Sequence, residues 1–189
     1  HARCEVVTDT IIIEVTLVPT VYAGVDSTLC STESYTLKGS SNVTVVWSTS
    51  GTGSFDDATK EDAVYTPSAA DILDGQVQLT ITTTATGDCE NITDVITLTF
   101  WRQATVYAGI DAALCGNGSY QVLDATAADY AGVLWTRTGT SGGSLSGATS
   151  LTPLYTAGGS GIDTLILTVQ PLHARCEVVT DTIIIEVTL

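Results

Sequence analysis

The chain has 189 residues, of which 44% are hydrophobic and only 6% aromatic, and its formal net charge is −15 at pH 7. Charge of this sign excludes a surface built for nucleic-acid phosphates and disfavours an anionic membrane, so neither partner is expected. The apolar runs fall far short of the roughly 20 residues that span a bilayer, so membrane insertion is not expected. A core of Val, Ile, Leu and Thr predicts an all-β fold.

The first and last stretches of the chain have the same sequence. Residues 1–17 read HARCEVVTDTIIIEVTL, and residues 173–189 repeat them at every position, so the sequence recurs with an offset of 173 − 1 = 172. The favoured interpretation is a piece of a tandem array of nearly identical units, and duplication of one end by engineering is the alternative. In such an array residues 1–17 are the terminal strand of a preceding module, and neighbouring copies of the repeat are the partners.

A weaker repeat with about half this period divides each unit into two modules. The segment Val21–Cys30 (VYAGVDSTLC) returns as Val106–Cys115 (VYAGIDAALC), at an offset of 106 − 21 = 85. We therefore expect one module at residues 18–100 and a second at residues 101–189. The connectors between modules are too short to act as flexible tethers. Trp101 lies in one of them, and we expect it to pack between the two modules.

Short segments of alternating polarity predict the strands. Residues 76–84 and 92–100 are expected to form a hairpin. Residues 182–189 alternate between apolar and polar side chains, as expected of a strand with one buried face. About seven such strands in each module, with Trp47 or Trp135 on a middle strand, predict two tandem immunoglobulin-like or PKD-like antiparallel β-sandwiches with both Trp rings in their cores.

Five cysteines occupy equivalent places in the repeats. The spacing from Cys30 to Cys89 (89 − 30 = 59) nearly equals that from Cys115 to Cys176 (176 − 115 = 61). The predicted disulfides are therefore Cys30–Cys89 and Cys115–Cys176, one within each module. Cys4 is the copy of Cys176 and is expected to be unpaired, because its partner would belong to the preceding module. Disulfides persist in oxidising surroundings, which predicts an exported protein.

No group of residues in the sequence supports catalysis. The two histidines, His1 and His173, are copies of one position, and the acidic residues of segment 56–62 are typical of a solvated face. We therefore expect a non-enzymatic protein that needs no cofactor. Calcium is the one metal to consider, since Asp26 and Asp111 recur after each Tyr-Ala-Gly turn, although a turn-capping role is favoured for both carboxylates.

The recurring motifs resemble one known family. They are Val-Tyr-Ala-Gly-x-Asp-x-x-Leu-Cys in both modules, a Trp followed by Gly-Thr-Gly within residues 47–53, and YTPSAADILDG at residues 65–75. These motifs look like the repeats of SprB-like giant surface adhesins of gliding bacteria, which resemble PKD and immunoglobulin-like modules. The resemblance covers essentially the whole chain, but the second module lacks the Pro and the Asp-rich turn at residues 155–159.

This resemblance implies an exported, filamentous, cell-surface protein. It acts as a stalk or spacer and as a multivalent surface in attachment or gliding, because avidity rises with copy number. The implied partners are neighbouring copies of the repeat, together with surface polysaccharide or substratum. The alternative is a pair of carbohydrate-binding modules from a secreted enzyme, which would need exposed coplanar aromatic rings.

The resemblance also implies a possible modification. Bacteria of this group O-glycosylate exported proteins at Ser or Thr that follow Asp. The matching acceptors in this sequence are Thr10, Ser27, Thr164 and Thr182.

Overall fold

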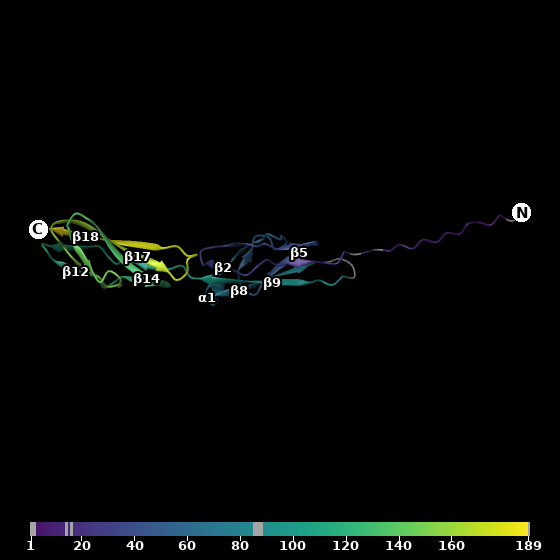
Figure 1. Cartoon of the computed structure of the whole chain (residues 1–189), viewed down its shortest axis with the longest axis horizontal. Coiled ribbons are helices and arrows are strands. Elements are labelled where there is room, and N and C mark those ends of the chain that lie inside the picture. Colours follow the sequence, from purple (N-terminus) through teal and green to yellow (C-terminus); the bar gives the residue numbers. More distant parts are fainter. Residues whose placement is uncertain (1–2, 14, 16, 85–88, 189) are drawn as a thin grey trace.

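The computed structural model describes residues 3–13, 15, 17–84 and 89–188. Two elongated β-rich bodies lie end to end, and the N-terminal residues extend away from the first of them (Figure 1). One hydrophobic core is made of side chains from the segment 23–100, and the other of side chains from the segment 104–187. We refer to the two bodies as module 1 and module 2.

Module 1 consists of two facing sheets. A four-stranded sheet of order β2-β9-β8-β5 packs against a three-stranded sheet of order β3-β7-β6, and β1 pairs with β4. The strands are β1 (Val21–Tyr22), β2 (Ser27–Cys30), β3 (Tyr35–Thr36), β4 (Ser40–Ser41), β5 (Val45–Thr49), β6 (Ser54–Phe55), β7 (Val64–Thr66), β8 (Gln76–Thr83) and β9 (Thr93–Trp101). A short helix, α1 (Ala69–Asp74), connects the sheets and begins with a capping box made by Ser68 and Asp71.

Module 2 repeats this arrangement. A sheet of order β11-β18-β17-β14 packs against a sheet of order β12-β16-β15, and β10 pairs with β13. The strands are β10 (Thr105–Tyr107), β11 (Ala112–Cys115), β12 (Ser119–Gln121), β13 (Thr126–Ala128), β14 (Tyr130–Gly139), β15 (Ser144–Ser146), β16 (Leu154–Thr156), β17 (Gly161–Pro171) and β18 (Val179–Thr188). Both modules are therefore immunoglobulin-like β-sandwiches, as the sequence predicts.

Several local expectations are confirmed. The predicted hairpin is the antiparallel pair β8–β9. Trp47 and Trp135 are only 3% and 2% exposed, and each indole N–H donates to a backbone carbonyl, of Lys60 and Ser150 respectively, at 3.0 Å. On β18 the predicted alternation holds as far as Thr188, while Leu189 lies outside the described residues.

The sandwiches are not wholly antiparallel, however. β2 runs parallel to β9, and β11 runs parallel to β18. A chain that enters a sandwich at one end and leaves it at the other has its first and last long strands running in the same direction. Only parallel pairing can then join them, and the alternation of side chains on a strand does not reveal this choice.

Each core contains a buried tyrosine that donates a hydrogen bond to a buried aspartate. The Tyr65 hydroxyl lies 2.7 Å from Asp71, and the Tyr155 hydroxyl lies 2.8 Å from Asp163. The pKa of Tyr65 is raised to about 12, mainly by burial. The hydrogen bond with Thr49 lowers this pKa, and the Asp71 carboxylate raises it. Neither pair was predicted from the sequence.

A glycine lies against each of these tyrosines. A Cβ at Gly53 or Gly143 would overlap the Tyr65 or Tyr155 hydroxyl, whereas a Cβ at Gly132 would meet no atom within 4 Å. Gly53→Ala and Gly143→Ala are therefore expected to destabilise their own modules by about 1–3 kcal/mol through overpacking. Gly132→Ala is the matched control, and urea unfolding of the three variants is the measurement. Equal midpoints for all three would contradict the expected overlap.

Candidate functional site

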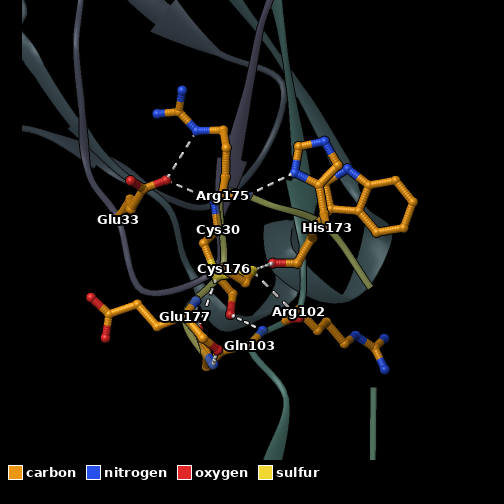
Figure 2. The surroundings of a disulfide bond; sticks show 10 residues. Cys30, Glu33, Arg102, Gln103, His173, Arg175, Cys176 and Glu177 are labelled. Atoms are coloured by element: carbon orange, nitrogen blue, oxygen red, sulfur yellow. Dashed lines mark hydrogen bonds and ion pairs between the residues drawn. A yellow bond between two sulfur atoms is a disulfide. The ribbon is translucent and has the colours of Figure 1, made fainter. Parts of the chain in front are cut away.

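Three segments meet where the modules join. They are the end of β2 with the turn that follows it (residues 30–33), the last residue of β9 with the connector that follows it (residues 101–103), and the connection between β17 and β18 (residues 172–178). Figure 2 shows how their side chains converge on a single disulfide.

The disulfide joins the two modules. Cys30 of module 1 is bonded to Cys176 of module 2, with 5.1 Å between their Cα atoms. Both residues are buried, with exposed fractions of 1% and 6%. The predicted pairs Cys30–Cys89 and Cys115–Cys176 are therefore wrong. Cys89 and Cys115 carry free thiols, as does Cys4, for which no partner was expected.

Strand geometry explains why the predicted pairs do not form. Cys30 lies opposite Trp101, at the end of β9, whereas Cys89 precedes the start of β9 at Thr93. Cys30 and Cys89 therefore lie at opposite ends of β9, whose length is about 26 Å at about 3.3 Å per residue. Disulfides require Cα atoms about 4.4–6.8 Å apart. In module 2, Cys115 and Cys176 are kept apart by the length of β18 in the same way.

Hydrogen bonds surround the disulfide and cross the junction. The Gln103 side chain donates to the Glu177 carbonyl at 2.6 Å and accepts from the Glu177 N–H at 3.0 Å. The backbone N–H of Gln103 donates to the Ser31 hydroxyl, and the Ser31 N–H donates to the Trp101 carbonyl. The connector is therefore bonded to both modules, which limits bending at this point.

A ring stack and an ion pair complete the junction. Trp101 stacks on His173 with ring centroids 5.2 Å apart and an interplanar angle of 12°. Glu33 accepts from the Cys30 N–H at 2.8 Å and lies 3.5 Å from the Arg175 Nε. Because both charged side chains are more than a third exposed, solvent screens this pair and it contributes little to stability. Trp101, at the end of module 1, therefore contacts His173 of module 2 while its side chain stays partly exposed.

Trp101→Ala is expected to loosen the junction without unfolding either module. Stacked aromatic pairs contribute about 0.5–1.5 kcal/mol, so the angle between the modules should vary more widely in the variant. The effect should be larger after reduction, because the disulfide no longer limits the motion. Small-angle X-ray scattering measures it, and Tyr22→Ala, an exposed aromatic outside the junction, is the control. Indistinguishable scattering from the reduced wild-type and Trp101→Ala chains would contradict a role for the stack.

The two candidate calcium ligands have other roles in this structure. Asp26 accepts a hydrogen bond from the Thr97 N–H, and Asp111 accepts one from the Ile184 N–H, both at 2.8 Å. Each carboxylate therefore ties the loop before one strand to the last strand of its module. In the part of the chain that the structure describes, no three His, Cys, Asp or Glu residues gather as metal ligands would.

The candidate glycosylation sites differ in accessibility. Thr10 and Thr182 are exposed, Thr10 in the extended N-terminal segment and Thr182 on β18. Ser27 lies half-buried on β2. Thr164 is also half-buried, and the Asp163 that precedes it is fully buried. The exposed pair Thr10 and Thr182 remains a prediction from the resemblance.

No family model and no curated protein matches the chain. Among solved structures, it is similar to Sidekick-1 immunoglobulin domains 1–5 with 13% identity and a TM-score of 0.46, over 93% of this chain and 40% of that one. It is also similar to an E-to-A variant of titin domains I67–I69 (12% identity, TM-score 0.42, 89% of this chain and 65% of that one) and to human protocadherin-24 EC1-2 (11%, 0.43, 92% and 99%). The chain thus spans less than half of the Sidekick-1 structure. The described residues contain no helix long and apolar enough to cross a membrane.

Proposed function

We propose that this chain is a non-catalytic repeat segment of a long exported surface adhesin, in which it acts as a stalk. The observation that carries the proposal is the junction. A disulfide, two hydrogen bonds between Gln103 and Glu177, and the Trp101–His173 stack hold one sandwich to the next. A fixed link between consecutive sandwiches keeps the pair extended, which is what a spacer requires.

Charge and repetition support the same role. Because each chain of 189 residues carries a net charge of −15, neighbouring filaments repel each other. Identical copies multiply weak contacts with a surface polysaccharide or substratum, so attachment needs no strong single site. We infer that the protein works at the cell surface in attachment or gliding, and the disulfide is consistent with an oxidising extracellular environment.

Two measurements test this function. Chains of one, two and four repeat units are expected to be rods whose length, measured by electron microscopy, rises in proportion to the number of units. Beads carrying these chains are expected to attach to polysaccharide-coated glass with a strength that rises faster than copy number. Coiled particles of constant diameter would contradict the stalk, and attachment strictly proportional to copy number would contradict the multivalent surface.

A further inference from the structure

The free cysteines Cys89 and Cys115 have the same local settings as the two that are bonded. Cys115 ends β11 opposite Thr188, as Cys30 ends β2 opposite Trp101. The residue after each cysteine donates its N–H to the carbonyl of that opposite residue, at 2.7 Å for Gly116 and 2.8 Å for Ser31. The parallel strand pair therefore presents Cys115 at the end of module 2 as it presents Cys30 at the end of module 1.

Cys89 in turn corresponds to Cys176. Both lie in the connection between the last two strands of a module, at the same short distance in sequence before an aspartate. Those aspartates, Asp94 and Asp181, accept a backbone N–H from Ala23 and Ala108 respectively, both at 2.8 Å. Cys89 is only partly buried and Cys115 is exposed, so both thiols are accessible.

The spacing of the cysteines agrees with these equivalences. Cys30 and Cys176 have a sequence separation of 146. If the sequence continues with the offset of 172 that its two ends set, the next copy of Cys89 follows Cys115 by 89 + 172 − 115 = 146. The same arithmetic places the partner of Cys4 at Cys30 of the preceding copy.

We propose that Cys115 forms a disulfide with Cys89 of the following copy, so that every junction of the tandem array is covalently closed. This inference rests on the tandem arrangement of the proposed function. The two thiols lose two protons and two electrons, and a disulfide-bearing oxidant accepts them and leaves as two thiols. Each new S–S bond thus forms by thiol–disulfide exchange.

The junction between module 2 and the following copy of module 1 is expected to depend more heavily on its disulfide than the junction between module 1 and module 2. Buried Pro19 corresponds to buried Ala104 at the offset between modules, so Val18 takes the place of Gln103. A valine side chain cannot make the pair of hydrogen bonds that Gln103 makes with Glu177. The cysteines are therefore what the two junctions share, and the polar contacts around them differ.

The test uses a chain in which Leu189 is followed by a second copy of residues 18–189. This chain has nine cysteines, five from the original sequence and four from the added copy. Titration of thiols in the unfolded, unreduced protein is expected to find three: Cys4, the first Cys89 and the last Cys115. If Cys115 and Cys89 do not join across copies, five thiols remain and the proposal fails.

Two matched substitutions sharpen the result. Cys115→Ser in the first copy removes a bonded cysteine and is expected to raise the count from three to four. Cys115→Ser in the second copy removes a free thiol and is expected to lower it to two. If the number of free thiols is lower in both variants than in the unsubstituted two-copy chain, the proposal is overturned. Fluorescence of the buried Trp47 and Trp135 reports whether each variant is folded. Because thiol counts do not involve adhesion, the attachment test can fail while this one succeeds.

Discussion

Asp163→Ala is expected to lower the free energy of unfolding of module 2 by about 3–5 kcal/mol, because it breaks a buried ion pair and leaves the partner groups unsatisfied. The Asp163 carboxylate is fully buried. It accepts hydrogen bonds from the Ser141 hydroxyl at 2.6 Å, the Tyr155 hydroxyl at 2.8 Å and the Arg137 guanidinium at 2.9 Å. Native-state hydrogen exchange measured by mass spectrometry reports each module separately and gives the loss.

The same carboxylate makes stability depend on pH. Burial raises the pKa of Asp163, but the hydrogen bonds from Ser141, Tyr155 and Arg137 outweigh it and lower that pKa to about 2, from an ordinary value of 3.8. A lowered folded-state pKa stabilises the fold above the unfolded-state pKa, and this stabilisation is lost as pH falls towards the folded-state value. Module 2 should therefore lose about 2 kcal/mol through this group between about pH 4 and pH 2.

Two controls separate this group from general acid sensitivity. Glu186→Ala removes an exposed carboxylate from β18, and we expect it to change stability by less than about 0.5 kcal/mol. Asp163→Asn removes the titration, so its unfolding free energy should lack the additional loss between pH 4 and pH 2. If Asp163→Ala is no more destabilising than Glu186→Ala, the buried pair does not stabilise module 2.

The chain should be far less extensible when oxidised than when reduced. When an oxidised chain is pulled by its ends, the tension is transmitted through the Cys30–Cys176 bond, and residues 31–175 bear none of it. Only residues 1–30 and 176–189 can then be extended. At about 3.4 Å per residue this allows an extension of about 150 Å, whereas all 189 residues of the reduced chain allow about 640 Å. Single-molecule stretching in the two redox states measures this fourfold difference.

Cysteine variants make the stretching result specific. Cys30→Ser should behave as the reduced chain under oxidising conditions, because it removes the shortcut. Cys115→Ser should behave as the oxidised wild type, since Cys115 is free in this chain. An oxidised wild type that reaches the reduced length would show that the bond between the modules is absent.

The architecture could be predicted from the sequence because one rule governs it throughout. Side chains alternate across a strand, so apolar alternation identifies the buried face of β18 and the hairpin β8–β9. The rule also applies to Asp163, which lies on the inward face of β17 with Leu165 and Leu167. Its burial was therefore predictable, but the Asp-Thr motif was interpreted only as a signal for modification.

The cysteine pairing could not be predicted from repeat equivalence alone. Equivalence shows that Cys30 matches Cys115 and that Cys89 matches Cys176, but it does not show at which end of a sandwich each lies. That depends on the parallel pairing of β2 with β9, which alternation does not reveal. One signal was present in the spacings. The two separations within modules are unequal, whereas the separation of 146 between Cys30 and Cys176 would recur between Cys115 and the next copy of Cys89 if the sequence continues with the offset of 172.

The extended N-terminal segment has a consequence for how such chains fold. Residues 1–17 have the sequence of residues 173–189, which include β18. Two copies of one sequence can therefore compete for the single strand position between β17 and β11. Occupation of that position by the wrong copy is domain swapping, to which tandem repeats are prone. Cys4 in the first copy corresponds to Cys176 in β18's own segment, so whichever copy pairs with β17 and β11 brings a cysteine to Cys30. The disulfide therefore fixes the strand that is in place when it forms, and we expect strand exchange to be slower in the oxidised chain than in the reduced one.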